Sequence, residues 1–279
     1  MRKFALIGYP LGHSISAHIH NAGFKSLGIE GDYKLLETTP DSLVDRLKQI
    51  KHDNYEGLNV TIPLKLPMSL FVNEVDAYAD LARAINTVII SPDKSMRGYN
   101  TDVMGFRRAI PSDIILTGKR IAILGTGGAA HAAIVALSEM KVAGIDLFTR
   151  NIPNSIDLVG YFRRKFPQVE FNIYQIDHIR ELRKYDMVVN TTPIGMLGHS
   201  ADLMPLEIGA METLKKDCIV YDVIYAPKKT KLLKEAEAMG LRTIGGLDML
   251  IYQAVCAEEL WFNRTPDFDK MKIAALENL

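Results

Sequence analysis

The chain has 279 residues, of which 48% are hydrophobic and 24% are charged, the proportions of an ordinary globular protein. This length exceeds what one hydrophobic core usually serves, so we expect two domains. Lys plus Arg and Asp plus Glu are equal at 33 each, which argues against a strongly basic surface for nucleic acid or anionic lipid.

The N-terminus has two basic residues before a short apolar run, which superficially resembles a secretion signal. Gly8, Tyr9 and Pro10 interrupt the run almost at once and no cleavage pattern follows, so we interpret it as a strand. No stretch of about 18 apolar residues predicts a membrane span. Cys218 and Cys256 lie in apolar surroundings without metal-ligand spacing, which predicts buried thiols. We therefore expect a cytoplasmic protein without membrane attachment.

Strand-like and helix-like segments alternate through the first hundred residues. Short apolar runs predict strands, and apolar residues at helical spacing predict helices between them. This alternation predicts a largely parallel sheet with helices on its faces. The expected strands are 4–7, 33–36, 57–62 and 85–90, and helices are expected over 14–27 and from a hydroxyl-proline start at Thr39 and Pro40.

A second series of strands and helices begins near Gly118 and has the order of a doubly wound, Rossmann-type domain. Its expected strands are 121–124, 145–148, 171–174, 187–190 and 219–222, with helices after 130 and over 232–239. The tail from Gly246 has helical periodicity and is expected to return to the first domain. We therefore predict an α/β fold of two domains joined by short hinges. One domain with a mostly parallel sheet spans 1–102 and 246–279, and a Rossmann-type dinucleotide-binding domain spans 103–245.

The segment 125–130 fits G-x-G-x-x-A between a strand and a helix. Gly125 permits the tight turn, Gly127 lets backbone amides approach a pyrophosphate, and Ala130 lets the helix sit close to the strand. The pattern predicts a dinucleotide cofactor, and an unoccupied structural turn is the alternative.

The end of the next strand decides between NAD and NADP. NAD sites usually carry a carboxylate there for the ribose 2′-hydroxyl. Asp146 is the candidate, but two apolar strand residues follow it, so it lies too early. Arg150 could grip a 2′-phosphate with its planar guanidinium, although it could also be a solvated surface arginine. We therefore predict NADP.

Three further segments carry polar side chains where strands or helices are expected to end or begin. Because ligand sites in open α/β sheets form beyond the carboxyl ends of strands, we expect these segments to converge. They contain Ser14 and Ser16, then Asn59, Thr61 and Lys65, and then Asn100, Thr101 and Asp102 just before a helix into the second domain.

An ordered set of motifs resembles the shikimate dehydrogenase family over nearly the full length. The motifs are G-x-P-x-G-H-S-x-S with His20-Asn21, N-V-T-I-P-x-K, Ile85-Asn86-Thr87, G-x-N-T-D, G-x-G-G-A-A, Asn190 to Met196, Tyr221 to Pro227, and Gly246 to Leu250 with Gln253. The resemblance implies the reversible, NADPH-dependent reduction of 3-dehydroshikimate to shikimate, a step of chorismate and aromatic amino acid biosynthesis.

The resemblance also implies residue roles, with Lys65 and Asp102 as the catalytic pair. A lysine ammonium near the ketone oxygen can donate the proton and stabilise the developing alkoxide. No zinc-ligand set is apparent, so no metal is expected. The implied substrate contacts are Ser14, Ser16 and Tyr225 for the carboxylate, and Asn59, Thr61, Asn86 and Gln253 for the ring. The implied cofactor contacts are Gly125, Thr126, Gly127, Gly128, Ala129, Ala130, Thr149, Arg150, Thr191, Met196, Ile224 and Gly246.

Several of these residues have a simpler interpretation. Helix capping alone could explain Ser14, and stabilisation of a turn alone could explain Asn86. Gln253 could be a surface residue. His13 and His20 could act as acid or base, but structural hydrogen bonding is favoured because Lys65 fills the catalytic role.

The chain departs from the family pattern at the adenosine end of the cofactor. His131 replaces a common basic residue after the glycine loop, and Thr149-Arg150-Asn151 replaces Asn-Arg-Thr. A quinate/shikimate dehydrogenase using NAD is therefore an alternative, and a non-catalytic sensor of shikimate-like ligands is another. The presence of both Lys65 and Asp102 argues against the sensor. The expected partners are small molecules, with the chain a monomer or homodimer.

Overall fold

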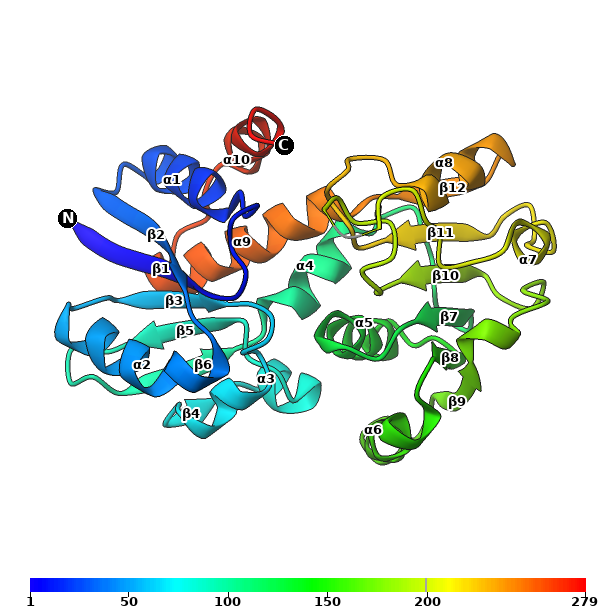
Figure 1. Ribbon diagram of the computed structural model, residues 1–279, viewed down its shortest axis with the longest axis horizontal. Coiled ribbons are helices and arrows are strands. Elements are labelled where there is room, and N and C mark those ends of the chain that lie inside the picture. Colours follow the sequence, from blue (N-terminus) through cyan, green and yellow to red (C-terminus); the bar gives the residue numbers. More distant parts are fainter. Residues whose placement is uncertain (199) are drawn as a thin grey trace. The chain divides into compact units, whose positions relative to one another are not determined.

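The computed structural model describes residues 1–198 and 200–279, which form two compact units (Figure 1). Unit 1 consists of Met1–Gly105 and Leu250–Leu279, and unit 2 consists of Phe106–Met249. Unit 2 is therefore an insertion in the sequence of unit 1. Within the described ranges, no helix is both long and apolar enough to cross a membrane.

Unit 1 is built on a six-stranded sheet of order β2-β1-β3-β5-β6-β4. β1 pairs in parallel with β2 and with β3, whereas β5 runs antiparallel to β3 and β6. The sheet is mostly parallel, as predicted. Its strands are β1 (Arg2–Gly8), β2 (Gly31–Glu37), β3 (Gly57–Val60), β4 (Glu74–Val75), β5 (Thr87–Ile90) and β6 (Met96–Tyr99).

Alternate side chains of β1 enter two different cores, because successive residues of a strand point to opposite faces of the sheet. Phe4 packs with Phe24 of α1 and Trp261 of α9, whereas Ala5 packs with Leu47 of α2. Figure 1 shows α1 and α10 on one side of this sheet and α2 on the other. The helices are α1 (Ser16–Leu27), α2 (Leu43–His52), α3 (Ala77–Ala82), α4 (Thr101–Ala109), α9 (Gly246–Phe262) and α10 (Phe268–Leu276).

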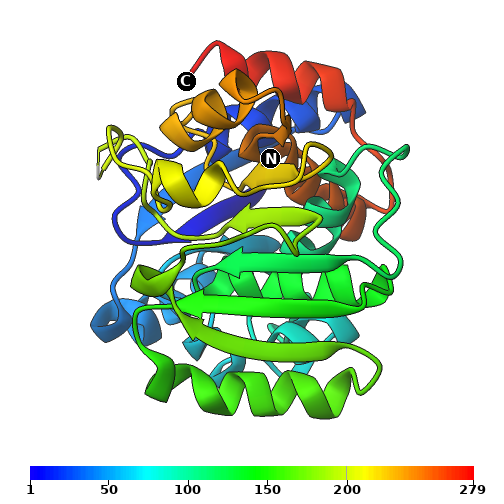
Figure 2. The ribbon, with the colours of Figure 1, turned by 90° about the vertical axis from the view of Figure 1, so that its right-hand side faces the viewer.

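Unit 2 contains an entirely parallel sheet of order β12-β11-β10-β7-β8-β9, whose strands lie side by side in Figure 2. In chain order this is the Rossmann arrangement, and the order reverses between β7 and β10. The strands are β7 (Arg120–Leu124), β8 (Gly144–Thr149), β9 (Glu170–Gln175), β10 (Met187–Asn190), β11 (Ile219–Asp222) and β12 (Arg242–Ile244). The helices are α5 (Gly128–Glu139), α6 (Ile152–Lys165), α7 (Ile208–Met211) and α8 (Lys231–Ala238).

The predicted fold class is confirmed, with differences at β5, at α4 and at three short strands. The strand predicted over 85–90 begins only at Thr87, and it is antiparallel to both of its neighbours, β3 and β6. β4, β6 and β12 have no counterpart among the predicted strands. The helix α4 begins at Thr101, so the segment 100–102 does not simply precede it, and Asp102 lies in its first turn.

Candidate active site

Lys65 and Asp102 form an ion pair in unit 1. Nζ of Lys65 lies 2.6 Å from Oδ2 of Asp102, and the two side chains are only 19% and 9% exposed. Lys65 lies in the loop after β3, and Asp102 lies in the first turn of α4, where the helix dipole favours a carboxylate. The lysine therefore holds its ammonium beside a carboxylate that little water reaches.

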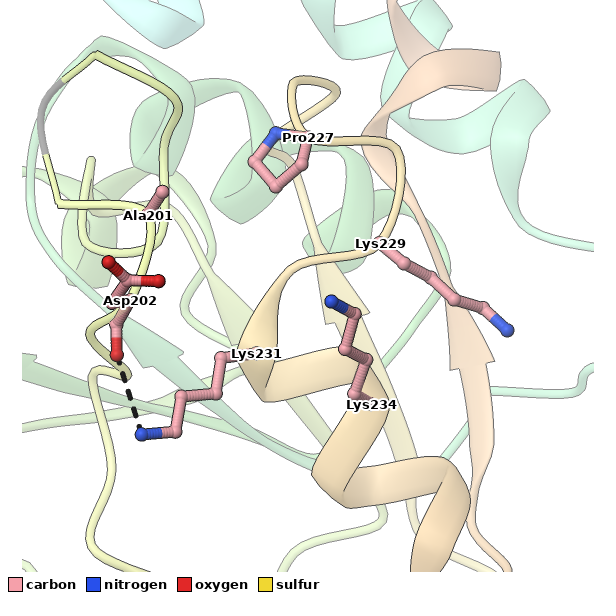
Figure 3. A pocket seen from close by; sticks show the side chains of 6 residues that line it. All are labelled: Ala201, Asp202, Pro227, Lys229, Lys231 and Lys234. Atoms are coloured by element: carbon pink, nitrogen blue, oxygen red, sulfur yellow. Dashed lines mark hydrogen bonds between the residues drawn. The ribbon is translucent and has the colours of Figure 1, made fainter.

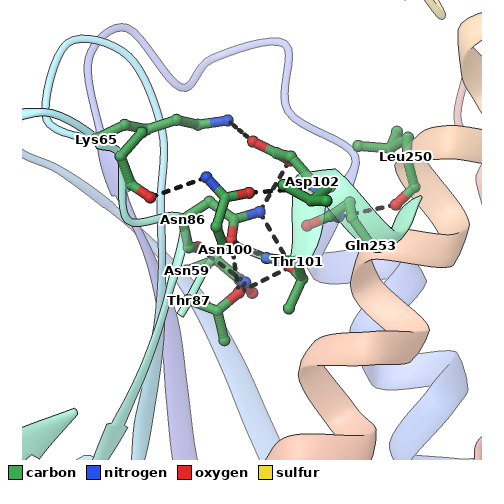
Figure 4. A network of polar contacts seen from close by, with 11 residues as sticks. Asn59, Lys65, Asn86, Thr87, Asn100, Thr101, Asp102, Leu250 and Gln253 are labelled. Carbon is green, nitrogen blue, oxygen red and sulfur yellow. Dashed lines mark hydrogen bonds and ion pairs between the residues drawn. The ribbon is translucent and has the colours of Figure 1, made fainter. Parts of the chain in front are cut away.

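Asn86 connects this ion pair to the sheet (Figure 4). Its Nδ2 donates to Oδ1 of Asp102 at 2.8 Å, and its Oδ1 accepts from the backbone N–H of Thr101 at 2.7 Å. The side chain is buried. Asn86 therefore does more than tie down a turn, because it holds the carboxylate that holds the lysine.

Asn59 contacts the backbone of Asn86, and both atoms of its side-chain amide make hydrogen bonds within the protein. Its Oδ1 accepts from the Tyr33 hydroxyl at 2.7 Å, and its Nδ2 donates to the Asn86 carbonyl and to Oγ1 of Thr87. The residue is buried. Asn59 was expected to line the substrate ring, which stays a prediction, and its amide also supports Asn86 and Thr87 from within. The contribution of Thr87 was missed, although it stands next to Asn86 in one of the motifs.

Ser14 and Ser16 lie together at the start of α1. The Ser14 hydroxyl donates to the Ser16 hydroxyl at 3.1 Å and accepts from the Ser16 backbone N–H at 3.3 Å. The helix begins at Ser16 with Ile15 as its N-cap, and no side chain makes the capping bond. Two half-buried hydroxyls are thus available at one position, and neither is a standard helix cap.

The other expected substrate contacts lie outside the hydrogen-bond network of the ion pair. Thr61 follows β3, and its backbone N–H donates to the Ile7 carbonyl at 2.9 Å. Gln253 donates through Nε2 to the Leu250 carbonyl of its own helix at 2.8 Å, as Figure 4 shows. Tyr225 belongs to unit 2 and is half-buried, and burial raises the pKa of its phenol.

The two candidate histidines differ in burial. His13 is exposed, whereas His20 is buried and its Nδ1 lies 2.9 Å from Oε1 of Glu258. The ring of His20 also stacks on Tyr33, with centroids 4.3 Å apart. Burial lowers the pKa of His20 to about 3 and raises the pKa of Glu258 to about 9, so both groups are neutral near pH 7. His20 therefore makes the structural hydrogen bond that the sequence favoured.

The glycine loop of unit 2 has the geometry that a dinucleotide needs. Gly125 has a φ of 101°, in the left-handed region that side chains disfavour, and a Cβ there would lie 2.9 Å from Oγ1 of Thr191. Gly127 is the N-cap of α5, and a Cβ added to it would meet no atom within 4 Å. Ala130 is fully buried. Open space thus adjoins the N-terminus of a twelve-residue helix, which suits a pyrophosphate.

The end of β8 is consistent with a phosphate rather than a ribose hydroxyl as ligand. Arg150 is exposed just after the strand, and Thr149 is buried with its Oγ1 3.5 Å from that of Thr126. Asp146, the candidate for an NAD ribose, is buried and bonded to Nζ of Lys184 at 2.6 Å and to the Tyr185 hydroxyl at 2.7 Å. Asp146 is therefore engaged in the interior, as its early position in the strand indicated.

The ends of β10 and β11 are tied together by Asp222. Its carboxylate accepts from Nδ2 of Asn190 at 3.1 Å and from the Thr230 hydroxyl at 2.7 Å. Burial raises the pKa of Asp222 to about 6. These bonds hold the loops that carry three of the predicted cofactor contacts, namely Thr191, Met196 and Ile224.

Gly246, another predicted cofactor contact, lies against the backbone at the end of β11. A Cβ at this position would lie 2.0 Å from the Val223 carbonyl oxygen, so only glycine fits. The backbone N–H of Gly246 donates to the Ile224 carbonyl at 3.2 Å. This close approach fixes where α9 begins.

A separate cavity of about 370 Å³ lies at the start of α8 (Figure 3). Lys229 in its wall pairs with Glu237 at 2.6 Å, and Nζ of Lys231 donates to the Asp202 carbonyl at 3.4 Å. Its other lining residues are Ala201, Pro227 and Lys234. None of the predicted cofactor contacts lines this cavity.

Comparison with known proteins identifies relatives along the whole chain. Residues 6–88 match the shikimate dehydrogenase substrate binding domain, and residues 246–276 match the shikimate 5′-dehydrogenase C-terminal domain. The shikimate dehydrogenase (NADP(+)) of Geobacillus kaustophilus is 37% identical over 282 residues, covering 100% of this chain and 99% of that protein.

Two solved structures have the same fold. A crystal structure of shikimate dehydrogenase in complex with NADP+ has a TM-score of 0.90 at 34% identity, covering 99% of this chain and 95% of that one. The shikimate 5-dehydrogenase of Thermus thermophilus, in complex with NADP(H) and shikimate, has a TM-score of 0.87 at 31% identity and covers 100% of both chains. With this likeness over its full length, the chain belongs to the shikimate dehydrogenase family.

Proposed function

We propose that this chain is an NADP-dependent shikimate dehydrogenase that reduces 3-dehydroshikimate reversibly to shikimate in aromatic amino acid biosynthesis. The observation that carries the proposal is the Lys65–Asp102 pair, 2.6 Å apart and shielded from water at the end of an α/β sheet. A protein that only sensed shikimate would not need an ammonium and a carboxylate held in this way.

Lys65 and Asp102 supply the acid-base part of the reaction. NADPH, when bound, supplies the hydride. The Lys65 ammonium donates a proton to the ketone oxygen as its negative charge develops, and in the reverse direction the amine takes the proton from the hydroxyl. Asp102 orients the lysine and can accept a bond from a substrate hydroxyl. Asn86 fixes Asp102 through its bond to Oδ1.

The remaining substrate contacts orient the ring. The paired hydroxyls of Ser14 and Ser16 donate to the substrate carboxylate, and Tyr225 donates to it as well. Thr61, Asn86 and Gln253 contact the ring hydroxyls. We assign Asn59 to the ring hydroxyls as well, and its bonds to Tyr33, Asn86 and Thr87 hold its amide in place.

The cofactor contacts lie in unit 2. The pyrophosphate would bind at the N-terminus of α5 through the backbone of residues 125–130, and Arg150 would contact the 2′-phosphate. Thr191, Met196 and Ile224 would line the nicotinamide end. The proposed functional division is a substrate domain of 1–102 with 246–279 and an NADP domain of 103–245. The two buried cysteines suit a cytoplasmic protein, which we propose to be a monomer or homodimer.

Absorbance at the nicotinamide band tests the proposal directly. The purified chain is assayed with shikimate and with quinate, each with NADP and with NAD. We expect the highest kcat/KM for shikimate with NADP. Preference for quinate with NAD would favour the alternative, a quinate/shikimate dehydrogenase that uses NAD. Ligand binding without turnover in all four assays would favour a sensor.

A further inference from the structure

Thr87 is fully buried at the start of β5, next to Asn86. Its Oγ1 has three polar neighbours, which Figure 4 shows. Nδ2 of Asn59 lies at 3.0 Å, Oδ1 of Asn86 at 3.1 Å and Oγ1 of Thr101 at 3.0 Å. The mechanism proposed above gives Thr87 no role.

The neighbours of Asn86 determine how its amide is oriented. A backbone N–H can only donate and a carboxylate oxygen can only accept. Asn86 must therefore present Oδ1 to the Thr101 N–H, at 2.7 Å, and Nδ2 to Oδ1 of Asp102, at 2.8 Å. A flipped amide would place donor against donor and acceptor against acceptor.

The same reasoning fixes the direction of the bonds at Thr87. Nδ2 of Asn59 lies 3.2 Å from the backbone carbonyl oxygen of Asn86, which can only accept. This atom is therefore the amide nitrogen, and it also donates to the Thr87 hydroxyl. The single proton of Thr87 is then directed to Oδ1 of Asn86 or to Oγ1 of Thr101. Thr87 thus joins an amide anchored on β3 to the amide that holds Asp102.

We propose that Thr87 is a positioning residue for the reaction. Its hydroxyl fixes Asn86 and Thr101, so that Asp102 receives Asn86 on Oδ1 and keeps Oδ2 for Lys65. The inference rests on the proposed function of Lys65 and Asp102. Removing the hydroxyl leaves one N–H of Asn59 without its acceptor and loosens Asn86 and the Asp102 carboxylate, while Ser14, Ser16 and the cofactor contacts are untouched.

A matched pair of variants separates the hydroxyl from the methyl group. Thr87→Val keeps the branched shape and loses the hydroxyl, whereas Thr87→Ser keeps the hydroxyl and loses the methyl. We expect Thr87→Val to lower kcat by about 10- to 100-fold, the scale of misplaced catalytic groups, with an unchanged KM for NADP. The midpoint of its kcat–pH profile should also move. Thr87→Ser should retain kcat within about threefold of the parent, the scale of a minor rate effect.

A packing role predicts a different pattern. A kcat for Thr87→Val within about threefold of the parent, or equal losses in both variants, would overturn the inference. Should Thr87→Val not fold, Thr87→Ala is compared with Thr87→Ser, and a kcat within about threefold of that of the serine variant would overturn the inference too. Lys65→Ala is assayed alongside. Parent-like turnover of that variant contradicts the proposed function, whereas an inactive Lys65→Ala with a normal Thr87→Val contradicts the role of Thr87 alone.

Discussion

At the scale of single residues, the ammonium of Lys65 lies 2.6 Å from the Asp102 carboxylate. Lys65→Ala removes the proton donor and leaves the substrate contacts in place. We expect kcat to fall by at least about 100-fold with little change in KM, which is the usual scale for a lost acid-base group. Steady-state kinetics with shikimate and NADP measure both constants. Turnover within about threefold of the parent would remove Lys65 from the mechanism.

Asp102→Asn tests the other half of the pair. The amide keeps the size of the side chain but has no charge, and its nitrogen cannot accept from Lys65 at the Oδ2 position. We expect kcat to fall severely, by about 100-fold or more. The same assay measures it, with a thermal melt as the control for folding. A parent-like kcat would show that the charge of Asp102 is dispensable.

Arg150 decides the choice of cofactor in our proposal. Arg150→Ala removes an exposed guanidinium at the end of β8 and should weaken NADP binding by about 1.5–3 kcal/mol, the range for a hydrogen bond between charged groups. NAD lacks the 2′-phosphate, so turnover with NAD serves as the internal control and should hardly change. Titration with both cofactors measures the difference, and equal losses for both would mean that Arg150 does not recognise the phosphate.

At the scale of elements, the start of α1 offers two hydroxyls 3.1 Å apart. If both donate to the substrate carboxylate, Ser14→Ala or Ser16→Ala should raise the KM for shikimate by roughly 10- to 100-fold, since a bond to a charged group contributes about 1.5–3 kcal/mol. The KM for NADP should stay constant. A local structural role predicts instead a stability loss of about 1 kcal/mol with normal shikimate affinity. A shikimate titration and a thermal melt on each variant distinguish the two.

The elements that could be predicted from the sequence are those with strong local signals. Residues 121–124 of β7 are a continuous apolar run followed by a glycine turn, and this pattern predicted both the strand and the dinucleotide loop after it. β6 was missed because Arg97 and Gly98 interrupt it, and Gly98 is there since a Cβ would lie 2.5 Å from the side chain of Ile85. The antiparallel pairing of β5 with β3 was missed too, because the apolar pattern of one strand does not show its direction.

Some residues of the candidate site could be predicted from the sequence, and others could not. The motifs identified Lys65 and Asp102, because their residue types carry the chemistry. The internal bonds of Asn59 and the role of Thr87 could not be predicted, since both depend on contacts with residues far along the chain. Thr87 and Asn59 are separated by 28 positions, and nothing in the local pattern of either shows the 3.0 Å contact.

At the scale of the whole molecule, the buried His20–Glu258 pair makes stability depend on pH. From about pH 6.5 to about pH 9, the folded chain keeps a proton on Glu258 that the unfolded chain has lost, because the ordinary pKa of this group is 4.5. Stability should therefore fall as the pH rises through this window, by up to about 1.4 kcal/mol per pH unit from this group. Between about 4.5 and 6.5, His20 is uncharged only in the folded chain, and the two effects cancel.

Glu258→Gln replaces the titratable carboxyl group by an amide and keeps the shape of the side chain. Urea unfolding of the parent and the variant at a series of pH values measures the difference between the two free energies of unfolding. As the pH rises from 6.5 to 9, the parent should lose stability relative to the variant. Parallel profiles across that window would mean that Glu258 is ionised in the folded chain.

The insertion of unit 2 has a consequence for the order in which the protein can fold during synthesis. Phe4 on β1 packs against Trp261, and the indole N–H of Trp261 donates to the Val88 carbonyl at 3.1 Å. At about 5–20 residues per second, a ribosome needs on the order of 10 to 50 seconds to make the chain between these two partners. All of unit 2 is synthesised within that interval. Unit 1 therefore cannot complete its packing until unit 2 has been made, because Phe4 on β1 has no α9 to pack against before then.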